Sequence, residues 1–274
     1  MLLRPIPSSG EQIPVVGLGS WLQFDVTGKE KEPLKNVLRT LAETGGKVID
    51  SSPMYGKSEE VLGELTAETG LSDKFFYATK VWTSGKQGGI RQMEESLRKM
   101  RRKTMDLMQI HNLLDWETHL GTLRQWKKEG KIRYIGITHY VDSAHPALEK
   151  IVRSEKIDFL QVNLSITGRN AEKTLLPAAM ENNVAVIINQ PFGQGALFSK
   201  VRGKPLPGWA GDYGIRSWAQ FFLKYILSNP AVTCVIPGTS VRKNMLDNAG
   251  AGKEPLPDEE TRAKMAALAD EGHL

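Results

Sequence analysis

Short apolar runs alternate along the chain with longer stretches whose apolar residues recur at helical spacing. Over most of the chain the runs begin about every 25–35 residues, which is the length of one strand-plus-helix unit. Helical periodicity is clearest at residues 90–102 and 118–129, and Gly45, Gly70 and Gly130 are placed to end helices. The pattern predicts eight strands, at residues 15–21, 47–50, 75–80, 105–110, 132–138, 159–163, 184–189 and 233–237.

Eight alternations of strand and helix are typical of one α/β architecture, the (β/α)8 TIM barrel. Residues 2–15, with Ser8-Ser9-Gly10 at their centre, predict a β-hairpin that precedes the barrel. The tail from Lys253 leads past two prolines into a last predicted helix at residues 259–269. Because one barrel takes about 250 residues, the sequence predicts a single domain over residues 1–274.

The composition narrows the class of protein further. Hydrophobic residues make up 40% of the chain, which is enough for a sizeable core. The chain has 36 Lys and Arg against 31 Asp and Glu, a net charge of +5. This mild excess suits an anionic ligand but does not indicate nucleic-acid binding. Cys234 is the single cysteine, so an intrachain disulfide and a thiolate metal cluster are excluded.

Other sequence features bear on metals, membranes and assembly. The five histidines show none of the HxH or HExxH spacings of a transition-metal site, so we expect no metal. No apolar run approaches the ~20 residues of a membrane helix, and the first residues lack the apolar region of a signal peptide. We therefore expect a cytoplasmic protein without a membrane partner, and a monomer or weak oligomer because no long heptad pattern stands out.

Polar residues follow one another at the predicted strand ends. In a (β/α)8 barrel the carboxyl ends of the strands form the active face, so these side chains are expected to converge on one pocket. In chain order the residues are Asp50, Lys80, His111, Thr138, His139, Gln161, Asn163, Asn189 and Gln190.

The first of these residues suggest acid–base chemistry. A lysine inside a barrel mouth must be paired, because an isolated buried ammonium is costly, and Asp50 is the obvious partner of Lys80. Tyr55 follows Asp50 by five residues. We expect the Lys80 ammonium to lower the pKa of this phenol from its ordinary value of ~10, which suits a general acid. His111 is placed to orient the same substrate oxygen.

The composition of two other segments indicates their character. Residues 98–103 contain five Lys and Arg residues, which favours a solvated helix end whose cations offset the helix dipole. The long segment 193–217 is rich in Gly and Pro, and a loop of that length in a compact domain is usually functional.

With these residues in place, the sequence resembles the aldo-keto reductase family over essentially its whole length. The specific signature is the aspartate–tyrosine loop followed in order by the lysine and the histidine. The matching segments are GLGSW (17–21), VIDSSPMYGKSEEVLGE (48–64), ATKVW (78–82), QIHN (109–112), YIGITHY (134–140) and IPGTSVRKNMLDN (236–248).

The resemblance implies an oxidoreductase that reduces aldehydes or ketones to alcohols with a nicotinamide cofactor, NADPH rather than NADH in most members. By position it implies Tyr55 as the proton donor, Lys80 and Asp50 as the pair that tunes its pKa, and His111 as the residue that orients the carbonyl. Trp21 and Trp82 correspond to residues that line the substrate pocket.

The resemblance also implies cofactor contacts, with departures from the family pattern. Thr138, His139 and Gln161 correspond to the residues at the nicotinamide carboxamide, and Asn189-Gln190 replaces the usual stacking tyrosine and its serine. Phe192 is a possible substitute platform. The remaining implied contacts are Gly193 and Gly195 at the pyrophosphate, Gly238, Thr239, Ser240, Arg242 and Lys243 at the 2′-phosphate, and Asp247 and Asn248 at the adenine.

Two alternatives stay open at this point. One is a Schiff-base aldolase on the same fold, with Lys80 as the nucleophile. The other is a barrel that binds the cofactor without appreciable turnover.

Overall fold

The computed structural model describes residues 1–272 and has eight parallel strands at its centre. Their order in the sheet follows the chain from β3 to β10, and each strand pairs with its sequence neighbours. Parallel bridges from Val16 to Val235 and from Gly19 to Gly238 join the two edge strands and close the barrel. The strands are β3 (Leu18–Gly19), β4 (Val48–Asp50), β5 (Phe76–Val81), β6 (Met105–His111), β7 (Ile132–Thr138), β8 (Phe159–Asn163), β9 (Ala185–Asn189) and β10 (Cys234–Val235).

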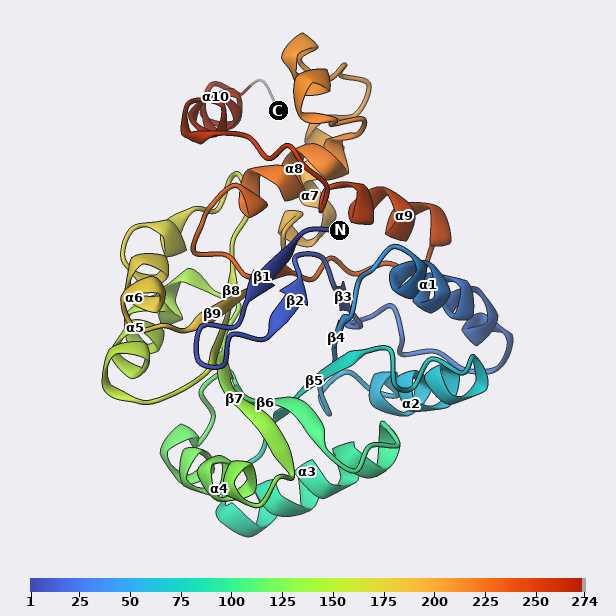
Figure 1. Cartoon of the computed structure of the whole chain (residues 1–274), viewed down its shortest axis with the longest axis vertical. Coiled ribbons are helices and arrows are strands. Elements are labelled where there is room, and N and C mark those ends of the chain that lie inside the picture. Colours follow the sequence, from blue (N-terminus) through green and yellow to red (C-terminus); the bar gives the residue numbers. More distant parts are fainter. Residues whose placement is uncertain (273–274) are drawn as a thin grey trace.

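Helices surround the barrel on the outside (Figure 1). The first shows why: Leu34, Val37, Leu38 and Leu41 are buried at helical spacing, which gives the helix one apolar face toward the strands. The helices are α1 (Glu32–Glu43), α2 (Ser58–Glu68), α3 (Lys86–Lys99), α4 (Trp116–Lys128), α5 (His145–Ser154), α6 (Leu175–Glu181), α7 (Ala196–Lys200), α8 (Trp218–Leu227), α9 (Arg242–Gly250) and α10 (Glu259–Asp270). Short 3-10 helices lie at Gly28–Lys31, Asp142–Ala144, Asn170–Glu172, Gly193–Gly195 and Gly208–Tyr213.

An antiparallel hairpin of β1 (Leu3–Pro5) and β2 (Gln12–Pro14) lies across one end of the barrel (Figure 1). Its Ile6 and Ile13 belong to a buried cluster with the strand residues Val48, Leu107 and Phe159. The hairpin thus covers the end at which the strands begin. The opposite end, where the strands stop, is left for the polar residues.

The predicted fold class is confirmed, with all eight strands and the hairpin. The predicted strands at 15–21 and 233–237 shrink to two residues each. A Cβ on Gly17 would lie 2.6 Å from the Val48 carbonyl oxygen, and one on Gly19 would lie 2.9 Å from that of Ile236. Backbones therefore approach closely here, and the irregular geometry shortens the ladder.

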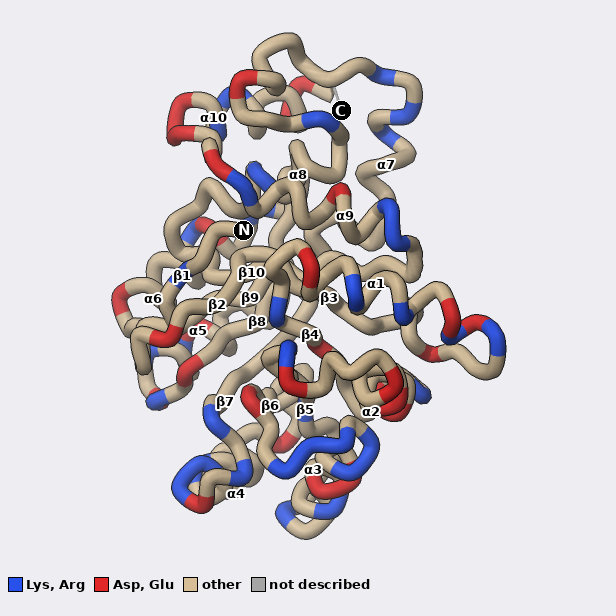
Figure 2. The backbone as a smooth tube through the Cα atoms, turned by 45° about the vertical axis from the view of Figure 1, so that its right-hand side comes forward, with Lys and Arg blue, Asp and Glu red and all other residues tan. Residues whose placement is uncertain are grey.

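The predicted basic helix end and the long loop take definite forms. Lys and Arg gather along α3 and α4 (Figure 2), and at the end of α3 the exposed Arg98 pairs with Glu95, as expected of a solvated helix end. Arg102, just beyond α3, is instead half-buried over the Tyr77 ring and donates to the Ser72 carbonyl. The segment 193–217 folds into two 3-10 helices and α7, and it projects beyond the barrel beside α10 (Figure 1). Among residues 1–272 no helix is long and apolar enough to cross a membrane.

Candidate active site

A cavity of about 580 Å³ opens at the carboxyl ends of the barrel strands. It brings together many of the residues that the sequence had placed there. Trp82 is not part of the lining, but its ring lies 6.3 Å from that of His111, centroid to centroid, at the same rim. The lining includes the predicted residues Trp21, Asp50, Tyr55, His111, Thr138, Gln161, Asn189, Gln190, Phe192, Gly195 and Gly238.

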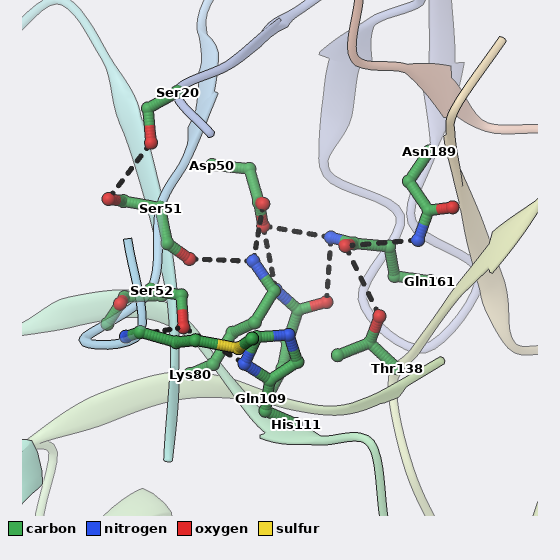
Figure 3. Close-up of polar contacts among 12 residues, drawn as sticks. Ser20, Asp50, Ser51, Ser52, Lys80, Gln109, His111, Thr138, Gln161 and Asn189 are labelled. Atoms are coloured by element: carbon green, nitrogen blue, oxygen red, sulfur yellow. Dashed lines mark hydrogen bonds and ion pairs between the residues drawn. The ribbon is translucent and has the colours of Figure 1, made fainter. Parts of the chain in front are cut away.

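Beneath the cavity, Asp50 and Lys80 form a buried ion pair (Figure 3). The Lys80 side chain is 0% exposed, and its Nζ donates to Asp50 Oδ2 at 2.5 Å and to the Ser51 carbonyl at 2.6 Å. The other carboxylate oxygen, Oδ1, accepts from Gln109 Nε2 at 2.9 Å and Gln161 Nε2 at 2.8 Å. Both charges are therefore compensated, as burial requires.

Tyr55 lies over this pair. The Lys80 Nζ is 4.9 Å from the centroid of the Tyr55 ring, and an ammonium with two hydrogen bonds has a third N–H to give. The expected lowering of the Tyr55 pKa is wrong as a net effect: burial and the Asp50 carboxylate raise the pKa of Tyr55 above its ordinary value, against the opposing influence of Lys80. The phenol is thus protonated at neutral pH, as a proton donor must be.

The pKa of Lys80 is raised, in keeping with a charged ammonium. Burial acts to lower the Lys80 pKa, but the Asp50 carboxylate and the Tyr55 phenol outweigh it. The lysine is therefore held as a cation between an acid and a phenol.

His111 stands beside Tyr55 at the end of β6. The two rings are perpendicular, with centroids 5.8 Å apart. Burial, together with the charge of Lys80 and the neighbouring His139, lowers the pKa of His111 from 6.5 to about 3. The imidazole is consequently neutral near pH 7, and it can act as a hydrogen-bond donor but not as a cation.

The side-chain amides of Gln161 and Asn189, which the resemblance implies as cofactor contacts, have different hydrogen-bond partners around the Asp50–Lys80 pair (Figure 3). Gln161 donates to Asp50 and Gln109 and accepts from Thr138 at 3.2 Å, so its amide is occupied by protein partners. Asn189 donates to the His139 carbonyl, whereas its buried Oδ1 has no hydrogen-bond partner among the described residues. Asn189 is thus the residue that presents an unused acceptor here.

Except for Gly195, which lines the cavity, the remaining predicted contacts lie outside its lining. Arg242 and Lys243 are exposed in the first turn of α9, and they follow the buried Thr239 and the half-buried Ser240 in the chain. Asp247 accepts from the Ser217 hydroxyl at 2.6 Å and from Gln220, which ties α9 to α8, and Asn248 is buried beside it. Gly193 and Gly195 both have positive φ in the turn before α7, next to Phe192.

Several functional residues were missed from the sequence. Gln109 lies two residues before His111 on β6, so the alternation of a strand places both on the inner side; this signal was available. The apolar rim residues Leu22, Met54 and Tyr140 sit in loops and Phe198 in the five-residue α7, where no periodicity marks them. Among residues 1–272 no group of three or more His, Cys, Asp or Glu could hold a metal ion.

Comparison with known proteins shows the family to which the chain belongs. A sequence model of the Aldo/keto reductase family matches residues 15–268. The chain belongs to this family. It is 28% identical over 257 residues to methylglyoxal reductase YeaE of Escherichia coli, which covers 91% of this chain and 89% of that protein. It is 26% identical over 290 residues to the aldo-keto reductase str7 of Strobilurus tenacellus, covering 92% and 85%.

Solved aldo-keto reductases share the fold. One from Klebsiella pneumoniae in complex with NADPH superposes with a TM-score of 0.83 at 24% identity, covering 98% of this chain and 95% of that one. Another from the same organism, in complex with NADP and acetate, has a TM-score of 0.81 at 25% identity, covering 94% and 92%. As an aldo-keto reductase, the protein is an oxidoreductase with a (β/α)8 barrel.

Proposed function

We propose that the protein reduces the carbonyl group of small aldehydes or ketones to alcohols, with NADPH as the cofactor. The observation that carries the proposal is the protonated, half-buried Tyr55 held over the Asp50–Lys80 pair beside a neutral His111. NADPH-bound family members support the choice of cofactor.

The residues of the mouth fit a nicotinamide. Asn189 lines the cavity, and a turn of its side chain would bring the unpaired, buried Oδ1 to the NH2 of the carboxamide as an acceptor. Thr138 and His139 adjoin it. Phe192 lines the cavity and offers a face for ring packing in place of the tyrosine that Asn189-Gln190 replaces. When bound, the reduced nicotinamide supplies a hydride to the carbonyl carbon.

The chain's own residues handle the proton and the oxygen. Tyr55 donates its phenolic proton to the carbonyl oxygen, and the Lys80 cation stabilises the phenolate that remains. His111 donates a hydrogen bond to the same oxygen and fixes its position. Asp50 keeps Lys80 charged and in place. Trp21 in the cavity lining and Trp82 at its rim, 45% and 39% exposed, offer apolar surface to the organic part of the substrate.

The preference for NADPH over NADH rests on the start of α9. Backbone N–H groups at a helix N-terminus attract anions, and the exposed Arg242 and Lys243 have no partner among the described residues. Replacing both by Ala is expected to weaken NADPH binding by about 10-fold or more and to leave NADH binding nearly unchanged. Equal losses for both cofactors would show that the 2′-phosphate is held elsewhere.

The aldolase alternative is disfavoured by burial. Lys80 is 0% exposed and donates to Asp50 and Ser51, so its amine is not free to attack a substrate. The direct test is titration of tryptophan fluorescence with NADPH and with NADH, followed by addition of nitrobenzaldehyde. Tight NADPH binding and loss of the reduced-nicotinamide absorbance are expected. Binding without oxidation of any carbonyl compound tried would instead indicate a barrel that only binds the cofactor.

A further inference from the structure

Ser52 carries a buried hydroxyl beside the candidate active site, and the proposed mechanism does not use this hydroxyl. It lies in the loop between β4 and α2 and is 0% exposed. Its Oγ is 3.0 Å from His111 Nδ1, and it accepts a hydrogen bond from the Met54 backbone N–H at 3.2 Å. Figure 3 shows the Ser52 side chain turned toward the imidazole of His111.

These contacts decide which way the hydrogen bond runs. A hydroxyl has one hydrogen to donate and can accept from two donors. Within residues 1–272, Ser52 Oγ has only the Met54 N–H and His111 Nδ1 as partners. If His111 Nδ1–H donated to Ser52, the serine hydrogen would be buried without an acceptor, which costs about 1–3 kcal/mol. The Ser52 hydroxyl must therefore donate to Nδ1.

We infer that Ser52 is a positioning residue that holds His111 in the tautomer with its proton on Nε2. Met54 N–H occupies one lone pair of Ser52 and so orients the hydroxyl hydrogen toward Nδ1. The other nitrogen of the His111 ring, Nε2, has no partner among the described residues, and His111 lines the cavity beside Tyr55. A neutral imidazole in this tautomer presents an N–H donor to the cavity.

The arrangement links two functions in one loop. The loop that carries Tyr55, the proposed proton donor, also carries Ser52, three residues earlier, which sets the donor on His111. This consequence for catalysis rests on the proposed function: two donors would meet at one carbonyl oxygen. The wrong tautomer would present a lone pair to that oxygen, and the two would repel.

The tautomer is read by NMR on the protein labelled with ¹⁵N-histidine, without cofactor or substrate. Long-range ¹H–¹⁵N spectra distinguish protonated from unprotonated ring nitrogens, and the His111 signals are those lost in His111→Asn. In the wild type at pH 7, we expect only Nε2 of His111 to be protonated. Ser52→Ala should give averaged nitrogen shifts from a mixture of tautomers, and Ser52→Thr, which keeps the hydroxyl, should restore the wild-type pattern.

Ser51→Ala is the matched control. Ser51 is also buried, but its hydroxyl contacts Ser20, so the His111 pattern should stay as in the wild type. A wild-type spectrum with Nδ1 protonated would overturn the inference, as would a Ser52→Ala spectrum identical to the wild type. If the protein is a reductase, Ser52→Ala should also lower kcat by about 10-fold at unchanged NADPH affinity. Because the spectrum needs neither turnover nor cofactor, a failure of the proposed function would not be mistaken for a failure of this inference.

Discussion

The Asp50–Lys80 pair is expected to stabilise the fold as a unit, and a double-mutant cycle tests this. Lys80→Met leaves a buried carboxylate that keeps the Gln109 and Gln161 donors but has no counter-charge. Asp50→Asn leaves an ammonium that is 0% exposed and has only neutral acceptors, such as the Ser51 carbonyl. Breaking a buried ion pair costs about 3–5 kcal/mol, because one charge stays buried and unpaired. Each single variant should therefore lose about 3–5 kcal/mol of unfolding free energy.

The double variant distinguishes a coupled pair from two independent sites. With both charges gone, we expect a loss no larger than that of either single variant, so that the coupling energy is about 3 kcal/mol or more. Urea unfolding at pH 7, followed by tryptophan fluorescence, measures all four proteins. The exposed pair Lys264–Glu260 serves as the control, and its cycle should show almost no coupling. Additive losses at Asp50 and Lys80 would refute the reasoning.

Two further predictions concern the loop of Tyr55 and the histidine. A Cβ on Gly56, whose φ is +57°, would lie 2.3 Å from Asp25 Oδ1, the acceptor of the Lys57 N–H. Gly56→Ala should therefore destabilise the protein by about 1–3 kcal/mol and lower kcat by about 10-fold or more. The control Gly70→Ala, at a glycine with similar φ and open space around it, should lower stability but not kcat. Equal losses of kcat in the two variants would contradict this prediction. Because the folded-state pKa of His111 is about 3 against 6.5 unfolded, its stabilising contribution is full above pH 6.5 and is lost toward pH 3, by about 1.4 kcal/mol per pH unit. Urea unfolding at a series of pH values measures this: between pH 6.5 and pH 3 the unfolding free energy of His111→Gln should fall less than that of the wild type. Parallel plots of unfolding free energy against pH would contradict the burial of a neutral imidazole.

Much of the fold was predictable because it follows from local patterns. Strands buried on both faces are rich in apolar residues, and such runs are visible at residues 132–138 and 159–163, which match β7 and β8. Asp50, Lys80 and His111 were predictable in the same way, since parallel strands bring their carboxyl ends to one face of the barrel.

Two features of the site could not be predicted from the sequence. They depend on how far a side chain is buried in the folded protein and on which groups compete for one hydrogen-bond partner. The pKa of Tyr55 rises because burial outweighs the Lys80 cation, and the extent of burial is fixed only when the chain is folded. Gln161 is occupied by Asp50 and Gln109, which leaves Asn189 with the unused acceptor. No sequence spacing predicts which amide binds Asp50, because this depends on how the side chains lie in the folded barrel.

The role of Tyr55 is the central claim, and a single-turnover comparison of the wild type with Tyr55→Phe tests it most directly. Enzyme preloaded with saturating NADPH is mixed with nitrobenzaldehyde, and the reduced-nicotinamide absorbance is followed, after the NADPH dissociation constant has been measured for both proteins. The account predicts that Tyr55→Phe binds NADPH nearly as tightly as the wild type but oxidises it about 100-fold or more slowly, because only the proton donor is lost. Turnover within a few-fold of the wild type at equal NADPH affinity would contradict it.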